Sequence, residues 1–213
     1  MAVIVDVLRA TSTIATALHQ GMTAVYPVAT VAECVALGRE RGCLTAAERD
    51  GVRAAGVDLG NSPFELLHED YPVRGRELAI STTNGTRALR HSLAAEALVC
   101  GAFINLTAVA DFCRAQQRDI LVVAAGWKGK FASKTPCWAG PWPSACCPTA
   151  STSAQSDAAL TAYQLWQNAR ADLPSYLHAV GRPAPPARAG SQRRLPLLHP
   201  SRRLPRRATS VGW

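Results

Sequence analysis

The chain has 213 residues, of which 48% are hydrophobic, and a formal net charge of +8. This length favours one domain with a sizeable core, and no apolar run is long enough to cross a bilayer. The eight arginines of residues 181–213 account for the whole excess charge, but they come without an RNA-binding motif or interleaved aromatic residues, so a nucleic-acid partner is not indicated.

Apolar, strand-like segments alternate with helix-favouring segments along residues 1–180, which predicts an α/β domain. We expect strands at residues 3–7, 24–28, 43–46, 77–81, 97–100 and 119–125. We expect helices at residues 12–20, 30–41, 63–68, 85–95, 104–116 and 157–170, with 172–178 as a candidate extension of the last helix.

The first strand ends at Asp6, a carboxylate in an otherwise apolar run. Arg9, Thr11 and Ser12 follow before the next helix. Parallel α/β sheets bind their ligands at the carboxyl ends of strands, so Asp6 is a candidate metal ligand or acid–base group. The alternative interpretation is that Asp6 caps the following loop.

A second junction of this kind follows the strand at 77–81. Its Asn-Gly pair is a strong turn signal, and its hydroxyls and the free N–H groups of a new helix favour a bound anion. Arg87 stands in the first helical turn, where a cation opposes the helix dipole unless an anion is bound nearby. A capped helix with a surface arginine is the alternative. The run is Thr82, Thr83, Asn84, Gly85, Thr86 and Arg87.

Two further loops carry polar groups. One holds the oxygen ligands Asp58, Asn61 and Ser62, and its Pro63 suits the first position of a helix. The other is the glycine-rich, basic loop around Lys128, which follows the apolar strand at 119–125. For Asn61, as for Asn84, substrate binding and simple turn formation remain alternatives.

Six segments carry a recognisable pattern and occur in the order 3–14, Glu48-Arg49, 58–63, 82–89, 101–105 and 125–127. With them the sequence resembles the 2-phosphosulfolactate phosphatase family, the phosphatase of coenzyme M biosynthesis, over about residues 3–132 and again around 157–178. This resemblance implies a three-layer α/β/α fold around a mixed, largely parallel sheet. It also implies a magnesium-dependent phosphomonoesterase that hydrolyses (2R)-O-phospho-3-sulfolactate to (2R)-3-sulfolactate and phosphate.

The residues suit such chemistry, because a strongly anionic phosphoester needs cations and helix N-termini. The candidate catalytic residues are Asp6, Arg9 and Arg87. Magnesium prefers one or two carboxylates with waters and phosphate oxygens, and the candidate ligands are Asp6, Glu48 and Asp58. The candidate substrate-binding residues are Thr11, Ser12, Asn61, Ser62, Thr82, Thr83, Asn84, Gly85, Thr86 and Lys128.

Other interpretations stay open. Asp6 as a phosphorylated nucleophile is a rival mechanism, although Leu8 stands where the familiar aspartyl-phosphatase pattern has a second Asp. A degenerate, non-catalytic anion-binding homologue and a phosphatase for another small phosphorylated acid are the functional alternatives. We expect no membrane partner, a candidate homo-oligomer, and a cytoplasmic protein with reduced, buried thiols at Cys34, Cys43, Cys100 and Cys113.

Three parts of the chain do not fit the domain at 1–180. Residues 133–155 show neither helical nor strand periodicity, and we hypothesise that they are translated out of frame. We expect residues 181–213, rich in Arg and Pro, to be disordered. Because Met1-Ala2 leads directly into a central strand, we also expect the chain to be truncated at its N-terminus.

Overall fold

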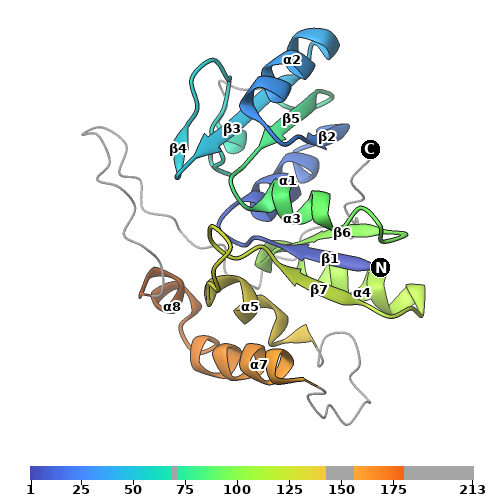
Figure 1. Cartoon of the computed structure of the whole chain (residues 1–213), viewed down its shortest axis with the longest axis vertical. Coiled ribbons are helices and arrows are strands. Elements are labelled where there is room, and N and C mark those ends of the chain that lie inside the picture. Colours follow the sequence, from blue (N-terminus) through green and yellow to red (C-terminus); the bar gives the residue numbers. More distant parts are fainter. Residues whose placement is uncertain (69–71, 143–155, 180–213) are drawn as a thin grey trace.

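The computed structural model describes residues 1–68, 72–142 and 156–179, and Figure 1 shows the arrangement of their elements. The strands are β1 (Ala2–Val5), β2 (Ala24–Pro27), β3 (Leu44–Arg49), β4 (Val52–Arg53), β5 (Glu77–Ser81), β6 (Leu98–Gly101) and β7 (Leu121–Ala124). The helices are α1 (Ala10–His19), α2 (Val31–Arg41), α3 (Gly85–His91), α4 (Leu106–Gln116), α5 (Lys134–Ala139), α7 (Asp157–Ala169) and α8 (Leu173–Ala179). Two short 3-10 helices are η1 (Glu65–Leu67) and η2 (Phe103–Asn105).

The strands form two sheets, in the orders β6-β1-β7 and β2-β5-β3-β4. All neighbours are parallel except β3 and β4. The predicted α/β class and the largely parallel pairing are therefore confirmed. The arrangement differs from one sheet between two helical layers, because α1 and α3 lie between the two sheets, with α2 beyond one sheet and α4, α5 and α7 beyond the other (Figure 1).

Alternation of side chains along β1 explains this layering. Ile4 faces the core that contains α1, the β2-β5-β3 strands and Leu89 of α3. Val3 and Val5 face the opposite side, where they pack with Val109 of α4 and Trp138 of α5. Both faces of β1 are buried, as expected for a central parallel strand.

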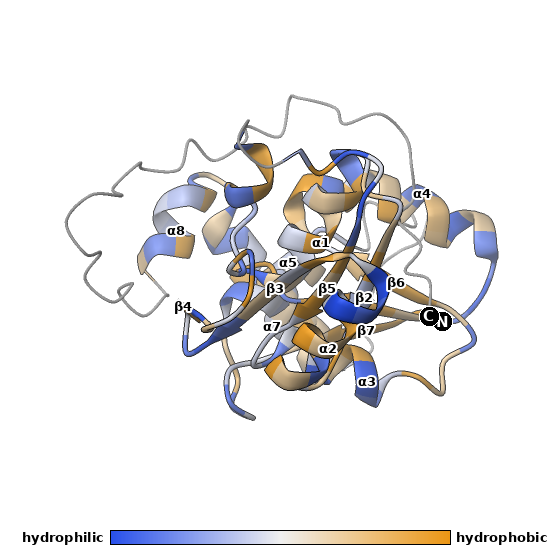
Figure 2. Cartoon of the chain, turned by 90° about the horizontal axis from the view of Figure 1, so that it is seen from above, coloured by the Kyte–Doolittle hydropathy of each residue, from blue (hydrophilic) through white to orange (hydrophobic). Residues whose placement is uncertain are grey.

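Hydrophobic colouring is concentrated on the strands in Figure 2, whereas the exposed hairpin around β4 is more hydrophilic. Within the described ranges, no helix combines the length and apolar character needed to cross a membrane.

Helix α5 was not predicted, since residues 133–155 carry no helical period. It forms because Cys137 and Trp138 are fully buried, and the ring of Trp138 packs at a tilt against that of Trp142, with 5.1 Å between the ring centroids. Gly140 lets α5 approach α7 closely: a Cβ there would lie 2.2 Å from the Cβ of Trp166. The hypothesis of a shifted reading frame is untested, and residues 143–155 and 181–213 lie outside the described residues.

Several predicted boundaries move for local reasons. Helix α3 ends at His91 instead of residue 95, because Ser92 N–H bonds back to Leu89 O in a tight turn. The predicted helix at 63–68 is only the 3-10 helix η1. Residues 172–178 start a separate helix, α8, where Asp172 Oδ1 accepts the N–H of Ser175.

Candidate functional site

The carboxyl ends of strands from both sheets converge on one site. Asp6 follows β1 and Lys128 follows β7, while Glu48 is the last residue but one of β3 and the turn at 82–84 follows β5. This is the edge where parallel sheets place their ligands. Each sheet therefore supplies some of the site residues. The N-terminal ends of α1 and α3 lie between the residues from one sheet and those from the other.

Asp6 is buried, with 8% of its surface exposed. Its backbone N–H donates to Thr11 Oγ1 at 3.0 Å, and that hydroxyl donates to Gly101 O at 2.7 Å. The pKa of the Asp6 carboxyl is raised to about 6, first by burial and then by the charge of Glu48, against opposing contributions from the backbone N–H of Ala10 and from Arg9. A buried carboxylate of this kind favours a bound cation.

Glu48 is also buried, and both of its oxygens accept backbone hydrogen bonds. Oε1 accepts the N–H of Thr83 at 2.8 Å, and Oε2 accepts the N–H of Gly51 at 2.7 Å. These bonds join the end of β3 to the end of β5 and to its own hairpin. Neither Asp6 nor Glu48 forms an ion pair at close range with any described residue.

The turn before α3 is held by its own hydroxyls and by a close helix contact. Thr86 N–H donates to Thr82 Oγ1 at 3.1 Å, and Thr86 Oγ1 donates to Thr82 O at 2.8 Å. A Cβ at Gly85 would lie 2.3 Å from the Cβ of Ala10 and 2.9 Å from Asp6 Oδ2, so only glycine allows α3 to pack this near the carboxylate.

The predicted cations differ in what they contact. Arg9 Nη2 donates to Gly51 O at 3.3 Å, and Lys128 Nζ forms an ion pair with Asp50. The backbone N–H of Lys128 donates to Asn84 Oδ1 at 2.9 Å, so Asn84 ties the β7 loop to α3. Arg87 is exposed, and within the described part of the chain it has no hydrogen bond or ion pair.

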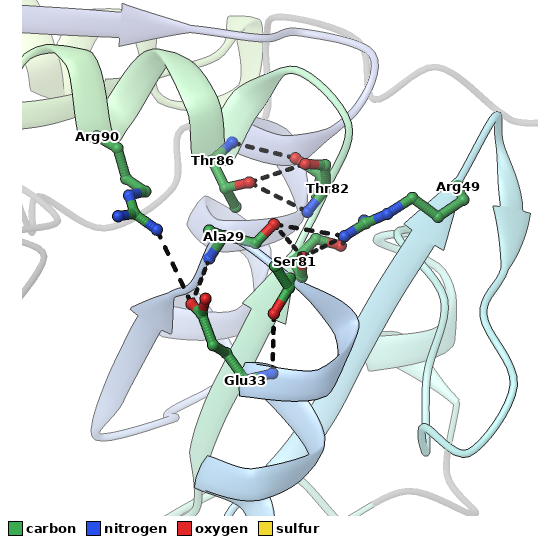
Figure 3. Close-up of polar contacts among 8 residues, drawn as sticks. Ala29, Glu33, Arg49, Ser81, Thr82, Thr86 and Arg90 are labelled. Atoms are coloured by element: carbon green, nitrogen blue, oxygen red, sulfur yellow. Dashed lines mark hydrogen bonds and ion pairs between the residues drawn. The ribbon is translucent and has the colours of Figure 1, made fainter.

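Arg49 lies at the site, although the sequence indicated it only as part of the Glu48-Arg49 segment and gave it no role. Its guanidinium donates to Glu48 O at 2.7 Å, to Ser81 Oγ at 2.9 Å and to Ala29 O at 3.4 Å. Figure 3 shows Arg49 reaching across to Ser81 and Ala29, below the Thr82–Thr86 contacts. The signal was a charged pair directly after a strand, a place where an arginine can bind the carbonyls of neighbouring strand ends.

Asp58 is not brought to Asp6 and Glu48. Its Oδ2 accepts the N–H of Thr45 at 2.8 Å and the Thr45 hydroxyl at 2.7 Å. Thr45 and Glu48 stand three residues apart on β3, so their side chains point to opposite faces. Among residues 1–68, 72–142 and 156–179, no three His, Cys, Asp or Glu side chains gather to hold a metal.

The remaining predicted hydroxyls and amide have separate positions. Ser12 Oγ donates to Val7 O at 2.7 Å and so serves the start of α1. Asn61 is buried at 5% exposure, whereas its neighbour Ser62 is half-buried.

The loop after β7 also lines a cavity of about 270 Å³, with Gly126, Lys130 and Pro136 in its wall.

The Asp6–Glu48 pair fits a magnesium ion. Two carboxylates are the usual protein contribution to such a site, with waters and phosphate oxygens completing the octahedron. Burial and mutual repulsion already destabilise the pair in its charged form, as the raised pKa of Asp6 indicates, and a divalent cation would relieve both effects.

Comparison with known proteins identifies the family. The family model described as 2-phosphosulpholactate phosphatase matches residues 1–182. A probable 2-phosphosulfolactate phosphatase of Thermotoga petrophila is 41% identical over 131 residues, which is 62% of this chain and 56% of that protein. The proteins of the same name from Carboxydothermus hydrogenoformans and Nostoc sp. are 38% identical over 131 residues and 41% over 143 residues, covering 53% and 58% of their lengths. This chain thus spans about half the length of the curated relatives it matches.

Proposed function

Because this chain belongs to the 2-phosphosulpholactate phosphatase family, we propose that it is a magnesium-dependent phosphomonoesterase. Its proposed reaction is the hydrolysis of (2R)-O-phospho-3-sulfolactate to (2R)-3-sulfolactate and phosphate, as a step of coenzyme M biosynthesis. The observation that carries this proposal is the buried Asp6–Glu48 pair at strand ends that also present Arg9 and Lys128.

Asp6 and Glu48 would hold the magnesium ion, which supplies charge to polarise the phosphoryl group. The two backbone bonds to Glu48 fix its carboxylate before the substrate arrives. Such preorganisation lowers the cost of binding charge at the moment of reaction. The hydrogen bond that the Asp6 N–H donates to Thr11 Oγ1 fixes the backbone of Asp6, and the close approach of Gly85 restricts the space around its carboxylate.

Arg9, Lys128 and Arg87 supply the positive charge for a substrate that carries phosphate, sulfonate and carboxylate groups. Arg9 and Lys128 contact the hairpin between β3 and β4, through Gly51 and Asp50. An arriving anion would compete with Asp50 for the ammonium group. Arg87 is exposed and free of a described partner, so it can take a second acidic group without losing a bond.

Asp6 is the residue whose protonation would set the pH dependence. With a pKa of about 6, it is ionised at neutral pH and can bind the cation or accept a proton from the attacking water. We further propose a reducing, cytoplasmic environment, since Cys34, Cys43, Cys100, Cys113 and Cys137 are buried free thiols.

The test is phosphate release from phosphosulfolactate by the purified full chain, with magnesium and with EDTA. We expect release with magnesium, loss in EDTA, and a drop of at least about 100-fold in Asp6→Asn, a typical cost of removing a charged catalytic group. Parallel assays with phospholactate and phosphoglycerate show whether the chain prefers the sulfonated substrate to other small phosphorylated acids. Release of phosphate only from another phosphorylated acid would contradict the assignment of sulfolactate as the substrate. The absence of phosphate release from every substrate would contradict the proposed phosphatase activity.

A further inference from the structure

Two buried oxygen atoms beside Glu48 have no hydrogen-bond partner among the described residues. They are Asn61 Oδ1 and Thr83 Oγ1. Buried polar groups are almost always bonded, so an unpartnered one requires an explanation, such as an ion or water that the atom contacts when the site is occupied. Asn61 is 95% buried, so its unpaired side-chain oxygen destabilises the folded state more than the hydroxyl of the half-buried Thr83 does.

The pairing of the 58–63 segment with β3 places Asn61 on the same side of β3 as Glu48. Leu59 forms a parallel bridge with Ala46, and Ala47 N–H donates to Leu59 O at 3.1 Å. Beyond Leu59 the segment leaves this edge of β3, because Arg53 of β4 pairs with Glu48 there. Leu59 and Leu66, on either side of Asn61, pack in the same core as Ala46, and Glu48 shares the face of Ala46, so Asn61 lies on the Glu48 side of β3.

The second atom marks the same place. Thr83 binds Glu48 Oε1 through its backbone N–H, and its hydroxyl is buried beside that contact. Asn61 Oδ1 can only accept, as can the carboxylates of Asp6 and Glu48. Acceptors cannot satisfy one another, so a donor or a cation must lie between them, and a divalent cation is the one species that also offsets the negative charge of the two buried carboxylates.

We propose that Asn61 supplies the third protein oxygen to the divalent cation held by Asp6 and Glu48, in the position that the sequence assigned to Asp58. This inference rests on the proposed magnesium site and names its missing ligand. It also explains why Asp58 is occupied elsewhere: by binding Thr45 it fixes the start of the loop that carries Asn61.

The experiment measures Mn²⁺ binding to the full chain by isothermal titration calorimetry and by the electron paramagnetic resonance signal of free Mn²⁺, after treatment with EDTA and dialysis. Asn61→Ala is expected to weaken Mn²⁺ binding by about tenfold or more, as loss of a supporting metal contact does. Asn61→Asp is expected to bind Mn²⁺ more tightly than wild type, because a carboxylate replaces the amide oxygen.

Two controls make the result specific. Asn168→Ala makes the same change at an exposed position of α7 and is expected to leave Mn²⁺ binding unchanged. Asp58→Asn is expected to retain wild-type affinity to within about threefold, because Asp58 lies on the other face of β3, and this margin is small beside the tenfold effect of a metal contact. Circular dichroism verifies that each variant is folded, and Asn61→Asp keeps the test decisive if Asn61→Ala does not fold.

Unchanged Mn²⁺ affinity in both Asn61 variants overturns the inference, as does a wild-type chain that binds no Mn²⁺. An effect of Asp58→Asn without an effect of the Asn61 variants would restore Asp58 as the ligand. The phosphatase proposal fails separately. If the wild-type chain binds Mn²⁺ through Asn61 but releases no phosphate, the cation site is supported and the phosphatase activity is contradicted.

Discussion

Asp6 combines a structural cost with a chemical use. In a folded chain without metal, its carboxyl has a pKa of about 6, against 3.8 for an exposed aspartate. The folded state therefore holds this proton more tightly than the unfolded state. The stabilisation that this proton contributes is fully present below about pH 4, and it decreases as the pH rises towards 6.

Asp6→Asn is expected to remove this pH dependence. In EDTA at pH 7 the variant should be more stable than wild type by about 3 kcal/mol, from a shift of roughly two pKa units, and the two should be equal near pH 4. Urea unfolding at both pH values measures the difference. A variant that is less stable at pH 7 would show that the carboxylate is compensated within the folded chain.

Arg49 is expected to support the site through its geometry. Arg49→Lys keeps the charge but cannot reach Glu48 O, Ser81 Oγ and Ala29 O together, so we expect a loss of about 1–2 kcal/mol in unfolding free energy. Arg118→Lys is the matched control, because its pair with Glu96 is exposed and worth less than about 1 kcal/mol. Equal losses in the two variants would contradict a special role for Arg49.

The sequence could locate the site at this scale but could not choose its ligands. Asp6, Glu48 and the 82–87 run were identifiable because strand ends and turn residues have local signatures. Asp58 was predicted together with the other carboxylates but bonds to Thr45 in the structure, because the face on which a loop side chain lies depends on the register between segments. That register, Leu59 against Ala46, is a long-range pairing that no local pattern encodes.

At the scale of elements, the hairpin between β3 and β4 and the loop after β7 contact each other through an exposed ion pair. Asp50→Asn would release Lys128, so inorganic phosphate is expected to inhibit the variant at a lower concentration than wild type, while stability changes by less than about 1 kcal/mol. Asp111→Asn, at the exposed pair with Arg114, serves as the control. Weaker inhibition in Asp50→Asn would instead assign Asp50 to the binding of the anion.

Helix α5 shows why composition misled the prediction of structure. Its residues have no helical period, yet burial of Trp138 against β6 and α4 stabilises a short helix that propensity alone would not. Trp138→Ala is expected to lower the unfolding free energy by about 3–5 kcal/mol, and Trp142→Ala, which is half-buried, by clearly less. Urea unfolding checks both, and similar small losses would mean that α5 does not contribute to the core.

At the scale of the molecule, one core joins the two sheets, since Ile4 and Cys100 share it with Leu78 and Ile80. We expect a single cooperative transition on unfolding. Fluorescence and far-ultraviolet circular dichroism can test this, because the tryptophans of the described ranges (127, 138, 142 and 166) belong to the half built on β6-β1-β7, whereas dichroism reports both halves. Separate midpoints would show that the halves unfold independently.

The α/β class followed from the alternation of strands and helices, which is a local property of the sequence. The division into two sheets did not, because every strand has the same apolar pattern whichever neighbour it pairs with. β1 belongs to a different sheet from β5 only because it pairs with β6 and β7, which lie far along the chain.

The position of α1 between the sheets has a consequence for the dimensions of the site. Asp6 belongs to one sheet and Glu48 to the other, so the separation of the two carboxylates depends on the thickness of the layer between them. The buried face of α1 is built mainly from small side chains, and Ala10 packs closely on Gly85. This helix thus acts as a spacer, and in the proposed magnesium site the volume of its alanines would set which ionic radius the two carboxylates could share.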